Sequence, residues 1–148
     1  MNRFDPEKSA GFLIARAAYH LKGQVRKFLA EADIQLSPEE IAILTAMAHL
    51  DSAKSMGELS ERLARDSTTL THQLKHLVEI GLVSREPSEA DRRIVNISIT
   101  TKGRALVEST MPLTLDLRKR TFEGISEADR KTLVRIMSRI LQNLREMK

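Results

Sequence analysis

Hydroxyl and imidazole side chains gather on one face of a helix that we expect to begin after Asp66. Leu70, Leu74 and Leu77 repeat at spacings of four and three residues, which places them in one apolar stripe along this helix. The polar groups left on the outer face are Ser67, Thr68, Thr71, His72, Lys75 and His76. Hydroxyl groups form hydrogen bonds with the edges of several nucleic-acid bases, and a threonine methyl group can contact thymine. The face is therefore suited to hydrogen-bonded recognition.

Two capped helices are expected to position this face. Ser55 and Glu58 form the pattern of a capping box, in which the Ser55 hydroxyl accepts from the Glu58 amide and the Glu58 carboxylate accepts from the Ser55 amide. Asp66 is suited to cap the second helix, and Gly81 fits the left-handed backbone that ends one. The sequence therefore predicts a helix-turn-helix.

A two-stranded ribbon is predicted directly after the second helix. Leu82 and Val83 begin an extended apolar run, and the segment from Arg93 to Ile99 alternates apolar and polar residues with the period of a half-buried strand. Residues 86–93 between them are polar and rich in turn formers. We interpret this ribbon as a wing, so residues 55–99 follow the order of a winged helix-turn-helix, a module that reads DNA.

Apolar seams lie towards both ends of the chain. The first seam repeats at spacings of four and three through Ile14, Ala18, Leu21, Val25, Phe28 and Ala32. The second seam, in a helix that should start at Ser126, repeats in the same way through Leu133, Met137, Ile140, Leu144 and Met147. This spacing is used for helix pairing, so we expect a homodimer built from the ends of the chain. Packing of the two helices within one chain is the alternative, and some of each is expected.

The predicted fold is a single domain, residues 1–148, that is mainly α-helical with a small β wing. The residues Ser37-Pro38-Glu39-Glu40 start a helix that should run to about His49. The segment from Thr101 to Glu123 is also helical in pattern, although Pro112 should kink it. The winged helix-turn-helix, or DNA-binding region, is placed at residues 36–102. Helical dimerisation regions flank it at residues 1–34 and 103–148.

Composition limits the classes of protein that this chain can belong to. It has 148 residues and no run of about eighteen apolar residues, so we expect no membrane partner. The first five residues lack the apolar segment of a secretory signal, and we expect a cytoplasmic protein. The sequence contains no cysteine, which excludes a disulfide framework and a reactive thiolate.

The charge of the chain is unevenly distributed. Its formal net charge is +4, and its isoelectric point is near 9.6. Basic residues exceed acidic ones by four in residues 103–148 but only by one in residues 52–102, and residues 1–51 have a net charge of −1. Residues 52–102, which contain the predicted helix-turn-helix and wing, are therefore almost neutral. DNA binding depends on where particular cations point rather than on net charge.

Four segments of the chain resemble the MarR family of transcriptional regulators. They are Asp66-Ser67-Thr68-Thr69-Leu70-Thr71, Gly81-Leu82-Val83, Asp91-Arg92-Arg93 and Ile99-Thr100-Thr101-Lys102-Gly103-Arg104. They agree with the family in order and spacing across about half of the chain. The resemblance implies a homodimer that binds double-stranded DNA, usually as a repressor released by a small-molecule effector or an oxidant. The cysteine-based oxidation switch of one branch of the family is excluded here.

The residues expected to contact DNA lie on the helix face, around its start and in the wing. The full set is Ser55, Arg65, Ser67, Thr68, Thr69, Thr71, His72, Lys75, Arg85, Asp91, Arg92 and Arg93. Outward residues near the amino end of a helix in the major groove reach base edges first. Base reading is accordingly assigned to Ser67, Thr68, Thr71 and His72, and phosphate contact to Arg65, Lys75, Arg85, Arg92 and Arg93.

At the wing, arginine is attracted into the narrow minor groove of A·T tracts. Arg92 or Arg93 is expected to enter it, and the resemblance implies that Asp91 orients the tip and favours Arg93 as the probe. The alternative is an ordinary solvated charged turn.

The histidines of this helix also raise the alternative of a metal site. His72 and His76 have the spacing by which two imidazoles can share a zinc ion, but cysteine and a nearby metalloprotease glutamate are both missing. We therefore predict no metal, no cofactor and no enzyme activity. Both histidines are instead expected to face DNA and to make affinity depend on pH. The competing function is a dimeric helical protein-interaction module whose helix-turn-helix does not bind DNA.

Overall fold

The structure is a computed structural model that describes residues 5–50, 52 and 54–147, in two compact units. Residues 1–111 form the first unit and residues 112–148 the second. The helices are α1 (Ala10–Glu31), α2 (Pro38–Ala48), α3 (Met56–Leu63), α4 (Ser67–Glu79), α5 (Thr101–Thr121) and α6 (Glu127–Glu146), preceded by a short 3-10 turn, η1 (Pro6–Lys8). The strands are β1 (Lys54–Ser55), β2 (Val83–Pro87) and β3 (Val95–Ile99).

The predicted class, mainly α with a small β wing, is confirmed. The predicted division into DNA-binding and dimerisation regions stays a prediction.

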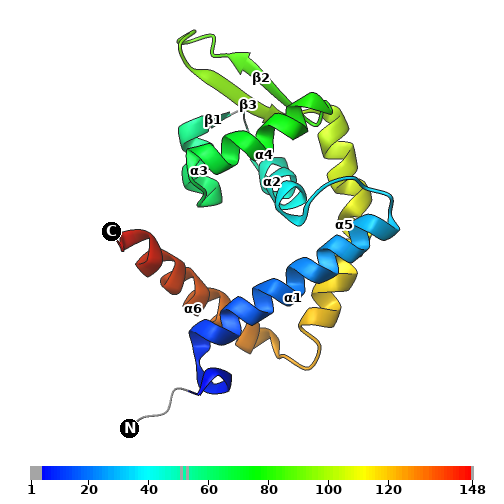
Figure 1. Ribbon diagram of the computed structural model, residues 1–148, viewed down its shortest axis with the longest axis vertical. Coiled ribbons are helices and arrows are strands. Elements are labelled where there is room, and N and C mark those ends of the chain that lie inside the picture. The colour runs from blue at the N-terminus through cyan, green and yellow to red at the C-terminus, as the bar shows by residue number, and fades with distance from the viewer. Residues whose placement is uncertain (1–4, 51, 53, 148) are drawn as a thin grey trace. The chain divides into compact units, whose positions relative to one another are not determined.

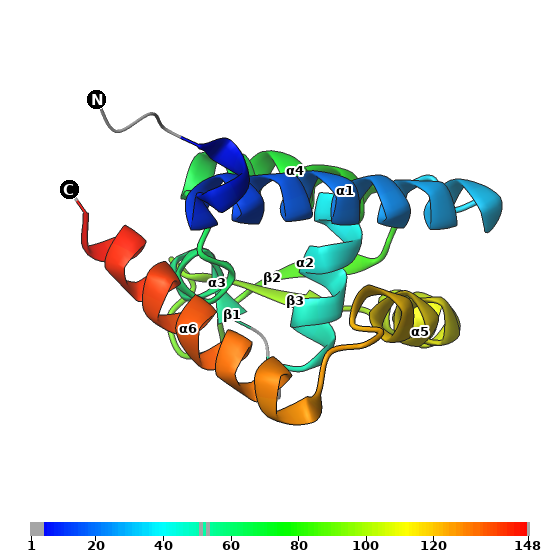
Figure 2. The same ribbon diagram turned by 90° about the horizontal axis from the view of Figure 1, so that it is seen from below.

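The sheet has three strands rather than the two that were predicted. Its order is β1-β3-β2, with both pairs antiparallel, and Figures 1 and 2 show the ribbon of β2 and β3 beside α3 and α4. The third strand, β1, is only two residues long, so it has no alternation that a sequence could reveal. It pairs Ser55 with Asn96, which attaches the start of α3 to the wing.

The bounds of the wing strands also differ from the prediction. β2 continues through Glu86 and Pro87, where a loop was expected, and β3 begins at Val95 rather than at Arg93. Pro87 lacks a backbone N–H but ends an edge strand, where proline is tolerated. The tip of the wing is therefore shifted by two residues along the chain, to residues 88–94.

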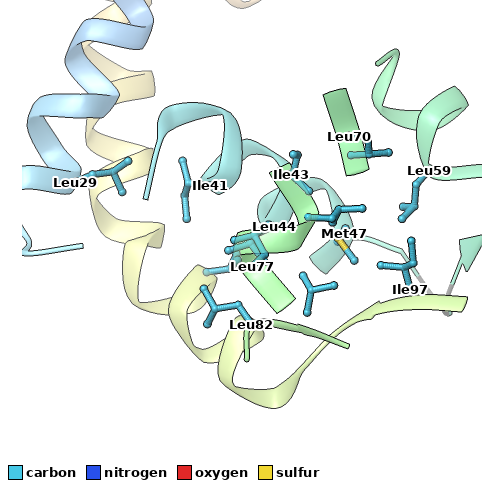
Figure 3. Packing of buried hydrophobic residues seen from close by; sticks show 13 residues of the cluster. Leu29, Ile41, Ile43, Leu44, Met47, Leu59, Leu70, Leu77, Leu82 and Ile97 are labelled. Carbon is cyan, nitrogen blue, oxygen red and sulfur yellow. The ribbon is translucent and has the colours of Figure 1, made fainter. Parts of the chain in front are cut away.

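The core of the first unit is built from leucine and isoleucine side chains of α2, α3, α4 and β3. Leu70, Leu74 and Leu77 are fully buried, as the stripe on α4 predicted. Figure 3 shows Leu77 beside Leu44 of α2, with Leu82 below them. Because this stripe faces the core, the opposite face of α4 is held towards solvent.

Helix α1 belongs to the same unit and is joined to α2 by one ion pair. Lys22 Nζ lies 2.8 Å from Glu39 Oε1, and this hydrogen bond holds the pKa of Glu39 below its ordinary range. Leu29 is the residue of α1 that is buried in the core. Much of the predicted seam of α1, including Ala18 and Leu21, is exposed in the single chain.

In the second unit, α6 starts as predicted. The Ser126 hydroxyl accepts from the Asp129 amide at 3.1 Å, and Gly124 before it adopts a positive φ of 75°. None of the residues of α6 is buried within the described chain. Its exposed apolar side chains are Leu133, Val134, Ile136, Leu141 and Leu144. The apolar face of α6 is therefore open in the single chain.

The start of α5 is tied to the turn that follows α4. The Thr100 hydroxyl donates to the Gly81 carbonyl at 2.7 Å and accepts from the Gly103 amide at 3.0 Å. One side chain therefore both holds the turn after α4 and caps the start of α5. Lys102 Nζ donates to the Ile80 carbonyl at 2.8 Å. These contacts give a physical role to the sequence from Thr100 to Gly103.

We predict that Gly103→Ala destabilises the protein. A Cβ at this position would lie 2.3 Å from the Leu82 carbonyl oxygen and 2.7 Å from Ile99 Cγ1, so backbone has to move. Overpacking of this kind costs about 1–3 kcal/mol.

Gly57→Ala in α3 is the matched control, because nothing lies within 4 Å of its Cβ. Loss of a helical glycine there should stabilise by about 0.5–1 kcal/mol. Urea denaturation of both variants measures this, and equal effects would contradict the packing at Gly103.

Candidate nucleic-acid interface

The turn between α3 and α4 is built by capping on both sides. The Ser55 hydroxyl accepts from the Glu58 amide at 3.3 Å, and Glu58 Oε2 accepts from the Ser55 amide at 2.8 Å, which confirms the predicted capping box. At the other end of α3, Ala64 adopts the left-handed conformation, and the Arg65 amide donates to the Ser60 carbonyl at 3.1 Å. This left-handed alanine was not predicted from the sequence.

Helix α4 begins at the residue that the sequence indicated. Asp66 Oδ1 accepts from the Thr69 amide at 2.8 Å. This bond is the main reason why the pKa of Asp66 lies below its ordinary range, because the hydrogen bond favours the charged carboxylate. A carboxylate at the amino end of a helix also complements its dipole. The Asp66 side chain therefore holds the first turn of α4 in place.

The four residues expected to read bases are exposed on α4. They are Ser67, Thr68, Thr71 and His72. The Thr71 hydroxyl donates to the Ser67 carbonyl at 2.6 Å, so its hydrogen is used within the helix while its oxygen and methyl group remain available. The Ser67 hydroxyl lies 3.1 Å from that of Ser60, which joins α4 to α3 at this point. Thr68 and His72 therefore present the polar groups of this face most directly.

The tip of the wing is held by a charged pair. Both Asp91 carboxylate oxygens accept from the Arg93 guanidinium, each at 3.1 Å, and Asp91 Oδ1 also accepts from the Arg93 amide at 3.1 Å. The Arg93 hydrogen bonds hold the pKa of Asp91 below its ordinary range. The Arg93 side chain nevertheless remains 90% exposed. A forked pair of this kind fixes the direction of a long side chain that stays accessible.

The other expected contact residues are spread between α3 and the wing. Lys75, Arg85 and Arg92 are exposed, as is Thr69, whereas Ser55 and Arg65 are half-buried. Lys75 Nζ lies 4.0 Å from Glu79 Oε1, so part of its charge is balanced on the helix itself. The reading face of α4 and the wing tip are thus two separate groups of residues on one compact unit.

Two residues that sequence reasoning did not select adjoin these groups. Lys54 of β1 precedes Ser55 and pairs with Ile97 of the wing. Its only sequence signal was a positive charge just before a capping box, and such charges are common. Glu40 was noted for its capping box alone, but it also contacts α4.

His76 contacts α2, a partner that the sequence did not predict, while its side chain remains 43% exposed. His76 Nδ1 lies 2.6 Å from Glu40 Oε1, across 36 residues of sequence. The contact uses one ring nitrogen of His76 and directs it towards α2. Among the described residues, no group of three or more His, Cys, Asp or Glu side chains is placed to hold a metal ion.

Comparison with known proteins assigns the family. A family model described as transcriptional regulator SarA/Rot matches residues 27–110, which is more than half of the chain. The organic hydroperoxide resistance transcriptional regulator of Bacillus subtilis is 30% identical over 132 residues, covering 85% of this chain and 88% of the relative. The chain belongs to the MarR/SarA family of transcriptional regulators. The predicted resemblance is confirmed.

Solved structures of this family share the fold. The chain superposes on BpsR of Bordetella bronchiseptica, whose DNA binding is regulated by 6-hydroxynicotinic acid, with a TM-score of 0.82 at 24% identity, covering 94% and 97% of the two chains. For the reduced form of E. coli MarR the TM-score is 0.72 at 25% identity, with coverage of 90% and 96%. For S. aureus MepR in complex with DNA it is 0.79 at 20% identity, with coverage of 91% and 98%. The matched family model and the Bacillus subtilis relative describe regulators of transcription, not enzymes.

In the part of the chain that the structure describes, no helix is both long and apolar enough to cross a membrane.

We predict that Arg93→Ala raises the pKa of Asp91 towards the ordinary aspartate range. The pKa is lowered in the folded protein, so the stabilising effect of this pair is present above the ordinary pKa and is lost as the pH falls through the lowered value. Carboxyl ¹³C titration by NMR measures the shift. Arg92→Ala is the matched control and should leave the Asp91 titration unchanged. An unchanged titration in Arg93→Ala would contradict the pair.

Proposed function

We propose that this family member is a cytoplasmic repressor that binds a pseudo-palindromic operator as a homodimer. In this proposal the outer face of α4 lies in the major groove, and Arg93 enters the minor groove. The observation that carries it is the arrangement of one compact unit, in which a capped helix exposes Thr68 and His72 while a charged pair directs an exposed arginine at the wing tip. A helix of this size fits the major groove, and a ribbon reaches the backbone and groove beside it.

The remaining expected residues act around these two groups. Arg65, Lys75, Arg85 and Arg92 contact phosphates, which position the protein without reading sequence. Ser55 and Thr69 are placed near the amino ends of α3 and α4, where backbone amides also face phosphates. Because the reading face carries hydroxyls rather than arginine, it lacks the strong signature for guanine. Sequence preference then depends jointly on α4 and on minor-groove shape at the wing.

The open apolar faces near the chain ends support the proposed homodimer. The exposed leucine, isoleucine and valine side chains of α6 form a face that a single chain leaves in water. Burial of apolar surface is the main favourable term in association. A symmetric dimer would present two α4 helices to half-sites about one helical turn apart, roughly 34 Å.

A small molecule is proposed to regulate the repressor. BpsR, which shares the fold, is regulated by 6-hydroxynicotinic acid, and MarR/SarA relatives include a regulator of organic hydroperoxide resistance. This sequence has no cysteine, so a thiol that senses hydroperoxide is not available to it. We therefore propose regulation by reversible binding of a small effector.

Selection from genomic DNA tests the proposed function. Purified protein is mixed with fragmented DNA from its source at about 150 mM salt, and the bound fragments are sequenced. A shared inverted repeat upstream of a few genes supports an operator-binding regulator. Recovery without a shared motif contradicts sequence-specific binding. No recovery favours the competing protein-interaction module, which the near-neutral charge of residues 52–102 makes the second candidate.

We predict a steep salt dependence of operator affinity. Each neutralised phosphate releases counterions, so a protein with six phosphate contacts should lose about a thousandfold in affinity between 50 and 200 mM salt. Fluorescence anisotropy with a labelled duplex measures this dependence. A flat profile would indicate an apolar interface rather than DNA binding.

We predict that Arg93→Ala weakens operator binding by about tenfold, in the range expected for loss of one groove contact. Lys27→Ala on α1 removes the same charge away from the wing and should bind as the wild type does. Sedimentation should show both variants as dimers. Equal affinity of Arg93→Ala and wild type would remove the wing tip from the interface.

We predict that Leu144→Glu dissociates the dimer. Leu144 is 56% exposed on the apolar face of α6, and a charge there would be buried without a partner in a dimer. Gln142→Glu places the same charge on the polar side of the same helix and should leave the dimer intact. Analytical ultracentrifugation distinguishes the two, and a dimeric Leu144→Glu would contradict this interface.

A further inference from the structure

Glu40 holds two helices with one carboxylate. Its Oε2 atom accepts from the Ser37 amide at 2.8 Å, which closes the capping box of α2. Its Oε1 atom lies 2.6 Å from His76 Nδ1 on α4. α2 and α4 lie side by side in Figures 1 and 2, and the Glu40 side chain is only 11% exposed. The start of α2 and the recognition helix are therefore joined at a shielded carboxylate.

This contact differs in kind from the packing around it. The leucine stripe of α4 decides which face of the helix is buried, because apolar side chains in a core pack closely. A hydrogen bond to a carboxylate adds a contact that is specific in distance and angle. His76 lies one turn beyond His72 and two turns beyond Thr68 on the same helix. A restraint at His76 therefore reinforces the direction in which Thr68 and His72 point.

We propose that His76 is a positioning residue for DNA recognition, acting through Glu40 to hold the reading face of α4 in register with α2. The inference rests on the proposed function, since it assigns a role in DNA reading to a residue that does not itself contact DNA.

The charged groups around His76 come from several elements. On α4 they are His72, Lys75 and Glu79, and on α2 the facing group is Glu40. Asp33, in the connection from α1 to α2, and Lys102 of α5 line the hollow on the other side of His76. Lys102 donates to the Ile80 carbonyl, and Lys75 lies near Glu79. The direct contact of the imidazole is thus with Glu40.

The test measures operator affinity at a single pH by fluorescence anisotropy. The probe is a labelled duplex that carries the inverted repeat recovered from genomic DNA, or a mixed-sequence duplex where none is recovered. His76→Ala removes the bond to Glu40 and should weaken binding about fivefold, as expected for the loss of one hydrogen bond. His76→Gln keeps a neutral donor and should recover most of the wild-type affinity. Glu40→Gln keeps an acceptor for the Ser37 amide, and adding it to His76→Ala should cost no further affinity, because the two residues act as one pair.

Two histidine variants serve as controls. His49 bonds to the Thr45 carbonyl on α2, away from the pair, so His49→Gln should bind as the wild type does. His72→Gln removes the proposed contact of α4 with bases and should lower affinity by the same factor with or without His76→Ala. The proposal is overturned if His76→Ala binds as tightly as wild type, or if His76→Gln recovers no affinity.

A second measurement needs no DNA. Amide hydrogen exchange in the free protein should be faster along α4 in His76→Ala than in wild type, by roughly tenfold if the restraint limits local opening. His49→Ala should leave α4 unchanged, and equal exchange in all three proteins overturns the proposal. If wild type binds no duplex at all, the proposed function fails first. If wild type binds and the variants at Glu40 and His76 match it, only the positioning role fails.

Discussion

The burial of three leucines on α4 is the constraint on which the rest of the reading surface depends. Leu70, Leu74 and Leu77 are fully buried against the core, and truncation of such a residue costs about 2–5 kcal/mol. Because the side chains of a helix project at fixed angles, this burial decides which residues face outward. The direction of Thr68 and His72 follows from it, and the caps at Ser55 and Asp66 then fix where each helix begins.

Local patterns in the sequence predicted most of this arrangement. Each of these features involves residues within a few positions of one another, so the sequence alone was enough to predict it. They are the capping boxes at Ser37 and Ser55, the aspartate cap of α4 and the left-handed Gly81. Contacts between distant segments left no such signal. β1 has two residues and is defined only by its partner, and the bond from His76 to Glu40 spans 36 residues.

In the candidate interface, too, contacts between neighbouring residues could be predicted and contacts between distant segments could not. All of its expected residues are exposed or half-buried, and the contact of Asp91 with Arg93, two residues apart, could be expected from the wing sequence. The contact of His76 with Glu40 was not predicted, because helical periodicity gives the side of the helix but not the partner that reaches it from another element. A shielded carboxylate such as Glu40 requires a partner, and that requirement becomes visible only in three dimensions.

The central claim is that the outer face of α4 and the wing tip contact DNA, and NMR shift mapping tests it most directly. Backbone amide resonances of the protein are followed as duplex DNA is added at moderate salt. The account predicts the largest changes at residues 67–75 and 91–93, with small changes along α6. Changes confined to α6 or to α1, with α4 and the wing unaffected, would contradict it.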